Sequence, residues 1–341
     1  MPTDLYPDYP VGTLHPESEA VLRELQAASA KPLSALSPRE ARACPLPEAW
    51  LGSVDPGVRI GNQVIPGRKG PIPIRTYSAG SASAQPLLVF FHGGGFVLGT
   101  LDEFDAFCAG LAGKGACTVV SVDYRLAPEH RFPAALEDAW SALLWIAAHG
   151  EELGGDPERI AVAGDSAGGN LAAGLCLQAR DQGFPRISFQ VLVCPWVDLS
   201  DSAEAAPSFR AFGQGLWLST ANLRWYRDHY VETPAQADHP LASPLRAESL
   251  VGLPPALVLT AEFDVLAAQG RAYALRLEEA GVPVTFRQHP GMLHDFLVMP
   301  GKFSEARAAF GQIAEAIHAA FHAPGPRKSP ETGQYLALAR G

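Results

Sequence analysis

Residues 160–170 read Ile-Ala-Val-Ala-Gly-Asp-Ser-Ala-Gly-Gly-Asn: an apolar run, the pattern Gly-x-Ser-x-Gly, and the start of a stretch rich in alanine and leucine. This pattern is typical of a sharp turn from a strand into a helix, which holds the serine in a strained backbone conformation at a cost of about 1–3 kcal/mol. Gly164 and Gly168 make room for the turn because they carry no side chain. The helix N-terminus points free N–H groups toward developing negative charge. Ser166 is therefore the candidate nucleophile.

Two other interpretations of this pattern stay open from these residues alone. A glycine-rich start of a helix can serve close packing only, or it can bind phosphate at the helix N-terminus. The apolar run before Gly164 and the helical stretch after Gly168 favour the nucleophile turn. A second glycine-rich segment upstream supports it further.

That second segment follows the apolar run 87–91 and consists of a histidine and three glycines. Since glycine has no Cβ atom, such a loop can bring backbone N–H groups close to a reacting carbonyl, where each donor is worth about 2.7–4 kcal/mol in the barrier. The N–H groups of Gly94, Gly95 and Ala167 are the candidate oxyanion donors. We interpret His92 as structural, a side chain that fixes the loop by hydrogen bonding.

Short apolar runs and amphipathic stretches alternate on both sides of the motif. The predicted strands are 58–65, 72–77, 87–91, 117–122, 159–163, 188–193, 256–260 and 283–288. The predicted helices between and after them are 104–113, 134–148, 168–181, 268–280 and 303–322. This alternation predicts an α/β fold with a mostly parallel sheet and helices on both faces.

About sixty residues separate the run that ends at Val193 from the run that starts at Ala256, too many for an ordinary connection and typical of a functional insertion. Its many aromatic residues indicate a helical cap over the carboxyl edge of the sheet, where ligands bind in open α/β folds. We interpret most of these aromatic residues as the core of the cap. The candidate residues of the substrate pocket are Trp196, Phe212, Leu216 and Trp217.

The chain is thus predicted to consist of a catalytic domain, a cap made of two segments, and a tail. The catalytic domain takes residues 51–194 and 236–322. The cap takes the N-terminal helical segment 1–50 and the inserted segment 195–235. Residues 323–341, which mix prolines with polar residues, are expected to form a loose C-terminal tail.

Three motifs together resemble the bacterial hormone-sensitive-lipase-like esterases, also called family IV carboxylesterases. They are His92-Gly93-Gly94-Gly95, Asp123-Tyr124-Arg125-Leu126-Ala127-Pro128-Glu129 and Gly164-Asp165-Ser166-Ala167-Gly168-Gly169. The resemblance extends from about residue 15 to 322. It implies the α/β-hydrolase fold with eight strands and a helical cap, and hydrolysis of short-chain esters without a cofactor. It also implies a homodimer through the edge of the last strand, near 284–288, and a structural loop at 124–129 whose charged groups pair internally.

A serine hydroxyl needs a histidine to take its proton, and the histidine needs an acid to fix its tautomer. In this fold the chain order is serine, acid, histidine, so the acid should follow the strand 256–260. Asp264 fits best, because the Asp-x-Leu motif of the hormone-sensitive-lipase-like esterases, which this chain resembles, falls on Asp264 and Leu266. Glu262 is the nearest competitor, and Asp198 follows the previous strand.

The base should follow the last strand, which leaves His289 and His294. His289 still belongs to that strand, whereas His294 lies in the loop beyond Gly291, so His294 is the candidate base. The sequence departs from the family pattern at two places. Asp295 stands where glycine usually follows the histidine. After the Asp-x-Leu motif, the charged residues that are frequent in the family are replaced by Ala267, Ala268 and Gln269. If Asp295 faces the imidazole, its charge should raise the pKa of His294.

Composition limits the possible partners. A formal net charge of −10 gives no electrostatic footprint for nucleic acid or an anionic membrane, and leaves small neutral or cationic partners open. The five cysteines are scattered and lack the spacing of a zinc site, so we expect them to be reduced and structural. The apolar run 87–91 is far too short to span a bilayer, and no basic region precedes an apolar stretch at the N-terminus, which predicts a cytoplasmic protein.

The sequence as a whole predicts a carboxylic ester hydrolase that acts through an acyl-enzyme intermediate. The same residues would serve another acyl substrate, such as an amide, a formamide or a lactone, because one nucleophile and one oxyanion site suit every acyl transfer. A binding protein without catalysis is a third possibility. It is less favoured because Ser166, Asp264 and His294 are all present.

Overall fold

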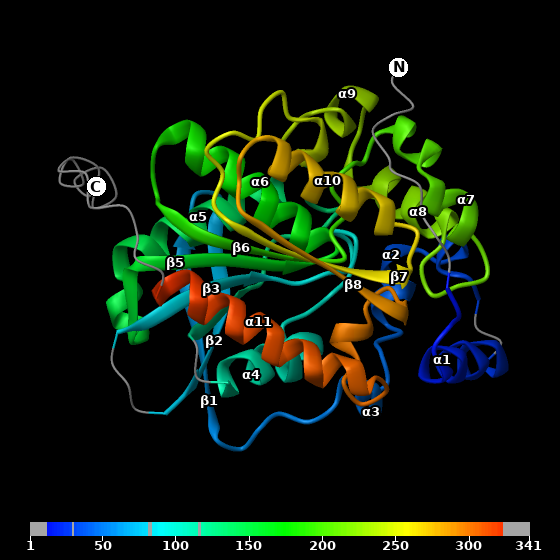
Figure 1. The fold of residues 1–341 in the computed structure, drawn as a ribbon, viewed down its shortest axis with the longest axis horizontal. Coiled ribbons are helices and arrows are strands. Elements are labelled where there is room, and N and C mark those ends of the chain that lie inside the picture. Colours follow the sequence, from blue (N-terminus) through cyan, green and yellow to red (C-terminus); the bar gives the residue numbers. More distant parts are fainter. Residues whose placement is uncertain (1–11, 29–30, 81–83, 115–116, 323–341) are drawn as a thin grey trace.

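The computed structural model describes residues 12–28, 31–80, 84–114 and 117–322 (Figure 1). Within these ranges the strands are β1 (Val58–Gly67), β2 (Gly70–Ala79), β3 (Gln85–Phe91), β4 (Thr118–Val122), β5 (Gly155–Asp165), β6 (Ile187–Val193), β7 (Ala256–Phe263) and β8 (Val284–Leu293). They form one eight-stranded sheet in the order β1-β2-β4-β3-β5-β6-β7-β8. β2 is antiparallel to both neighbours, and all other pairs are parallel. The tail expected at 323–341 lies outside the described residues.

The eight predicted strands are all present, which confirms the mostly parallel α/β sheet. Their ends differ most at β8, which was expected to end near residue 288 and instead continues to Leu293. His289 therefore lies well inside the strand. His294 follows the last residue of the strand directly, where a loop had been expected from Gly291 onward.

Helices cover both faces of the sheet (Figure 1). One face is covered by α4 (Asp105–Gly113) and α11 (Ser304–His322), the other by α5 (Ala134–His149), α6 (Ala167–Gln182) and α10 (Ala267–Glu279). Successive side chains of a strand point to opposite faces. Ile160 and Val162 of β5 accordingly pack with α5, α6 and α10, and Ala161 and Ala163 pack with α4 and α11.

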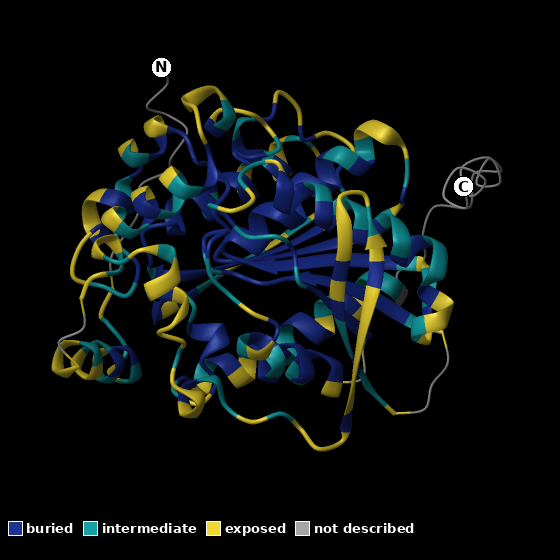
Figure 2. Ribbon diagram, turned by 180° about the vertical axis from the view of Figure 1, so that it is seen from behind, coloured by how far each residue is buried: buried dark blue, intermediate teal, exposed yellow. Residues whose placement is uncertain are grey.

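Burial follows these layers (Figure 2). The central strands are dark blue along their length, and β3 is a continuous apolar run because both of its faces are covered. The outer strand β1 is mostly exposed. No helix in the described ranges combines the length and the apolar character that a membrane crossing requires.

Two segments distant in the sequence meet beyond the carboxyl ends of the parallel strands. The first carries α1 (Pro16–Ala27), α2 (Pro38–Arg42) and α3 (Glu48–Leu51), and the second, between β6 and β7, carries α7 (Pro207–Phe212), α8 (Thr220–Tyr230) and α9 (Pro234–Ala237). α8 packs against the short turn at Leu33–Ala35. The indole N–H of Trp225 on α8 donates to the carbonyl oxygen of Leu36 at 3.0 Å. The N-terminal segment is thus attached to the insertion.

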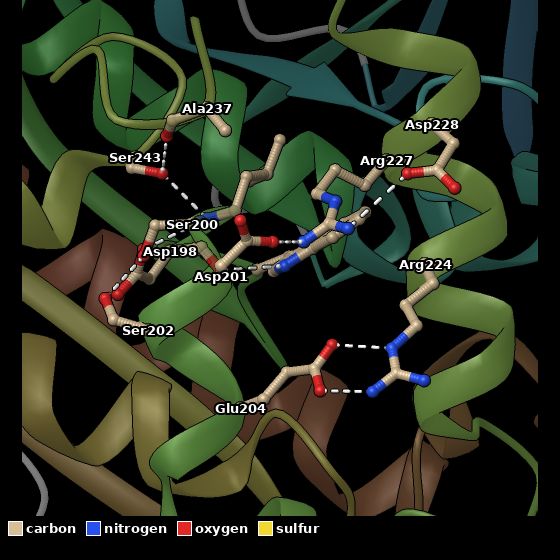
Figure 3. A network of polar contacts seen from close by, with 12 residues as sticks. Asp198, Ser200, Asp201, Ser202, Glu204, Arg224, Arg227, Asp228, Ala237 and Ser243 are labelled. Carbon is tan, nitrogen blue, oxygen red and sulfur yellow. Dashed lines mark hydrogen bonds and ion pairs between the residues drawn. The ribbon is translucent and has the colours of Figure 1, made fainter. Parts of the chain in front are cut away.

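A polar network holds the insertion together (Figure 3). Arg224 and Arg227 project from α8 toward the segment that follows β6, where Arg224 Nε lies 2.7 Å from Glu204 Oε1 and Arg227 Nη1 lies 2.5 Å from Asp201 Oδ1. Beneath them the buried hydroxyl of Ser243 accepts from the N–H of Leu199 and donates to a backbone carbonyl. Exposed ion pairs of this kind contribute little one by one, so the buried Ser243 contacts fix the position of the segment.

The loop at 124–129 is structural, but its charged groups do not pair with each other. Arg125 binds Asp138 of α5 with two N–H groups, at 2.7 and 2.8 Å. Glu129 binds Arg42 of α2 in the same bidentate manner, at 2.8 Å for both contacts. The loop therefore joins the sheet to α5 and to the N-terminal segment.

The turn from β5 into α6 is closely packed. Ser166 has a φ of 53° and a ψ of −112°, and α6 begins at the next residue. A Cβ atom on Gly164 would collide with the backbone of Gly168, and one on Gly168 would collide with the carbonyl group of Phe91 in β3. The two glycines of the motif are required because helix and strands touch here through their backbones.

We expect Gly168→Ala to destabilise the fold by about 3 kcal/mol, because the added methyl group meets backbone atoms that cannot rotate away. The matched control is Gly311→Ala in α11, where a Cβ atom meets nothing within 4 Å. That change should stabilise the protein by up to about 1 kcal/mol, since alanine favours a helix. Urea unfolding followed by circular dichroism measures both. Equal midpoints for the two variants would contradict this packing argument.

Candidate active site

The structure brings Ser166, His294 and Asp264 together in a hydrogen-bonded chain. Nε2 of His294 lies 3.0 Å from Oγ of Ser166, and Nδ1 lies 2.7 Å from Oδ2 of Asp264. All three side chains are buried. Each follows the carboxyl end of a parallel strand, β5, β8 or β7, so the sheet delivers them to one point.

This arrangement fixes the tautomer of the histidine. A carboxylate oxygen only accepts, so Nδ1 of His294 must carry the hydrogen and Nε2 of the neutral ring is free to accept the proton of Ser166. The carboxylate of Asp264 is held in turn, because its Oδ1 accepts from the N–H of Leu266 at 2.8 Å. The chain of contacts has the polarity that a general base requires.

Asp295 faces the imidazole, which the sequence could not show. Its Oδ1 lies 3.2 Å from Nε2 of His294, and its Oδ2 accepts from the indole N–H of Trp217 at 2.9 Å. Its backbone is left-handed, with a φ of 61°, a conformation that aspartate tolerates better than most residues. Burial opposes the charging of His294, but the charges of Asp264 and then Asp295 outweigh it. The pKa of His294 therefore lies well above its usual range.

The glycine loop lies beside the nucleophile. Gly94 and Gly95 line the same cavity as Ser166, with φ angles of 102° and 59°, and Ala167 is the first residue of α6, whose leading N–H groups have no partner inside the helix. His92 is held behind them: its Nδ1 lies 2.7 Å from the carbonyl oxygen of Gly93. Burial lowers the pKa of His92 to about 4, so the ring is neutral.

The other candidates for acid and base lie in structural contacts. The carboxylate of Glu262 accepts from the N–H groups of Gly12 and Gly291, at 2.6 and 2.7 Å, and so joins the N-terminal segment to β8. Asp198 accepts from the N–H of Ser200 in the insertion. His289 is paired with Glu305 of α11 at 2.9 Å.

A cavity of about 440 Å³ opens above Ser166, and the sequence predicted its walls only in part. Trp196 and Trp217 line it, but Phe212 and Leu216 do not. Phe212 is buried against Phe263, with ring centroids 5.2 Å apart, and Leu216 packs on the core under α4 and α11. Residues that the sequence analysis missed include Leu33, Leu36, Glu103, Leu218, Leu223 and Tyr226.

Of these, Leu223 and Tyr226 could have been found, because they lie three residues apart on one face of α8. The sequence analysis instead interpreted most aromatic residues of the insertion as the core of the cap. The leucines of the N-terminal segment carried no signal for the site. They reach it only through the packing of that segment on α8.

Among the described residues, one group of three side chains lies close enough together to hold a metal ion: Cys194, Asp264 and His294. Two of its members are already hydrogen-bonded to each other. The other ring nitrogen of His294 lies 3.0 Å from Oγ of Ser166, so both nitrogens of the ring are already engaged. The group fits the triad better than a metal centre.

The family described as alpha/beta hydrolase fold matches residues 88–298. The chain belongs to this family. The carboxylic ester hydrolase LipN of Mycobacterium tuberculosis is 41% identical over 261 residues, which cover 75% of this chain and 69% of LipN. An ethyl acetate hydrolase of Pseudomonas putida is 39% identical over 252 residues, 72% of this chain and 78% of that enzyme.

Solved structures of esterases have the same fold as this chain. The hyperthermophilic esterase of Pyrobaculum calidifontis superposes with a TM-score of 0.84 at 37% identity, over 90% of this chain and 99% of that one. A thermostable esterase of Pseudomonas putida gives 0.85 at 36% identity, over 91% and 98% of the two chains. The resemblance to the hormone-sensitive-lipase-like esterases, first drawn from three motifs, is confirmed.

The position of Asp295 predicts a shift in the pH profile. A base must be neutral to accept a proton, and Asp295 favours the charged imidazole, so the acid limb of kcat/KM should lie at higher pH in the wild type than in Asp295→Gly. Asp295→Asn is the matched control, because it removes the charge and keeps an oxygen for Trp217. Both variants should lower the midpoint of the acid limb. An unchanged midpoint in both would mean that Asp295 does not tune the base.

Proposed function

We propose that this α/β hydrolase is a serine carboxylesterase that hydrolyses short-chain carboxylic esters through a Ser166, His294 and Asp264 triad. One observation carries the proposal: the hydrogen-bonded chain from Asp264 through His294 to Ser166 ends at the base of a cavity beside the glycine loop. The printed names of the relatives, a carboxylic ester hydrolase and an ethyl acetate hydrolase, support esters as the substrate class.

In the proposed reaction, Oγ of Ser166 attacks the ester carbonyl carbon while its proton moves to Nε2 of His294. The carbonyl oxygen becomes negative and accepts hydrogen bonds from the N–H groups of Gly94, Gly95 and Ala167. When the intermediate collapses, the leaving alkoxide takes the proton from Nε2 and departs as the alcohol. Water repeats both steps on the acyl-enzyme, which releases the carboxylic acid and restores Ser166.

We also assign residues 1–50 and 195–235 to a cap over the catalytic domain formed by 51–194 and 236–322. The contact between α8 and the turn at Leu33–Ala35 supports this assignment, as does their shared lining of the cavity. The five cysteines, which are all unpaired in the structure, support a cytoplasmic location, which cell fractionation tests.

Replacing Ser166 or His294 by alanine should reduce turnover of p-nitrophenyl acetate by about 10⁴-fold or more, because the members of such a triad act as a unit. Both changes remove chemistry and little packing, so the thermal unfolding midpoint should stay close to that of the wild type. The control is His149→Ala, at the end of α5, which should keep wild-type activity. Retention of even a tenth of the activity by either triad variant would refute the assignment.

Acyl chains of about two to eight carbons should be the best substrates, because a cavity of about 440 Å³ has room for a limited apolar volume. A series of p-nitrophenyl esters from acetate to palmitate measures this preference. Leu223→Ala, which widens the cavity wall, should move the optimum to longer chains. Faster turnover of emulsified long-chain triglyceride than of a short soluble ester would contradict the limit.

We further propose a homodimer through β8, which forms one edge of the sheet. Residues 284–288 alternate between half-buried and exposed, and a strand at the edge of a sheet can pair with the same strand of a second copy. Light scattering at micromolar concentration should give twice the mass of the chain. Thr285→Lys should shift it toward the monomer by placing two like charges near the symmetry axis. A monomer in the wild type would exclude this dimer.

A further inference from the structure

The cavity above Ser166 carries two carboxylates. Asp295 lies at the catalytic base, 3.2 Å from Nε2 of His294. Glu103 lies in the short turn Asp102–Phe104, downstream of the glycine loop, and lines the same cavity. Burial raises the pKa of Glu103, hydrogen bonds from Leu46 and Thr100 oppose this, and the charge of Asp295 adds a smaller increase.

Two aromatic rings stand beside these carboxylates. Trp217 donates its indole N–H to Oδ2 of Asp295, and Tyr226 lies so close to Gly95 that a Cβ atom there would collide with the ring. Burial and the charges of Asp295 and Glu103 raise the pKa of Tyr226, so its hydroxyl stays protonated and the ring adds no charge of its own. Aromatic rings and carboxylates that line one cavity are surroundings that suit an organic cation.

The proton path shows which half of an ester meets these groups. The leaving alcohol receives its proton from Nε2 of His294. Asp295 Oδ1 is 3.2 Å from the same nitrogen, so the alcohol half of the substrate leaves Ser166 beside this carboxylate. A positive group two or three bonds beyond the ester oxygen would then lie near Asp295, in the cavity that Glu103, Trp217 and Tyr226 also line.

Other charges around the cavity do not cancel the two carboxylates. Arg42 lines the cavity, but its guanidinium binds Glu129 with two N–H groups and also donates to the carbonyl oxygens of Val97 and Ala127. Lys31 also lines the cavity, but it is exposed, so solvent screens its charge. Beneath the site, burial and the charge of Asp295 raise the pKa of Asp165 well above its usual range, so that group stays neutral.

We infer that the enzyme prefers esters whose alcohol half carries a cation, such as esters of amino alcohols, with Asp295 and Glu103 as the specificity-determining residues. This inference rests on the proposed esterase function. The formal net charge of −10 acts in the same direction, since it draws cations toward the protein at low ionic strength.

The test compares two acetates of equal shape, 2-(trimethylammonio)ethyl acetate and 3,3-dimethylbutyl acetate, in which a neutral carbon replaces the charged nitrogen. The measured quantity is the ratio of their kcat/KM values, cationic over neutral, at low ionic strength and at a pH above the acid limb. Both esters use the same triad, so the ratio removes any effect of a variant on the chemistry. The wild type should favour the cationic ester by about fivefold or more, and added salt should reduce the ratio.

Asp295→Asn and Glu103→Gln should each lower that ratio by about threefold to tenfold, and the double variant should bring it near one. The matched control is Asp181→Asn, which removes one exposed carboxylate about 21 Å along α6 from Ala167 and should leave the ratio unchanged. A wild-type ratio of one or less overturns the inference, and so does a ratio that neither cavity variant changes. In both cases, turnover of the neutral ester would still support the proposed esterase function. Failure to hydrolyse either acetate or p-nitrophenyl acetate overturns both.

Discussion

The strained turn at Ser166 is the constraint on which the site depends. A serine at a φ of 53° costs about 1–3 kcal/mol, and it persists because both neighbouring strands hold it. On one side Gly168 touches the backbone of β3, and on the other the N–H of Ser166 donates to the carbonyl oxygen of Val193 at 2.8 Å. Since β7 and β8 continue the same parallel sheet, their carboxyl ends bring Asp264 and His294 to this turn.

His294 is subject to two opposite electrostatic effects. Burial favours its neutral form, and the two carboxylates next to the ring stabilise its charged form more strongly. In the proposed reaction the carboxylates help when the ring accepts the proton of Ser166, and they hinder when the ring must first be neutral. Asp264 meets the ring at Nδ1 and fixes its tautomer, whereas Asp295 meets it at Nε2, the nitrogen that handles the reacting proton. The hydrogen bond from Trp217 holds the Asp295 carboxylate in place, so a residue of the insertion contributes indirectly to the raised pKa of His294.

The cavity depends on contacts between segments far apart in the chain. Its walls come from the N-terminal leucines, the glycine loop, α8 and the turn that carries His294. Trp225 ties α8 to Leu36, and Glu262 ties Gly12 to Gly291 of β8, so the insertion is fastened to the N-terminal segment and that segment is fastened to the sheet. The shape of the cavity can therefore change through these two segments while the strands and the contacts among Ser166, His294 and Asp264 stay as they are.

The sequence alone was sufficient to predict the succession of strands and helices along the chain. It was also sufficient to predict that Ser166, Asp264 and His294 lie together, because each follows an apolar run and a parallel sheet brings the ends of such strands to one edge. It failed for Phe212 and Leu216, which were assigned to the pocket by residue type and face the core instead. It could not place Asp295 against Nε2, the N-terminal leucines in the cavity, or the partners of Arg125 and Glu129. The direction of a side chain and its partners arise from packing between distant segments, and only the tertiary structure decides that packing.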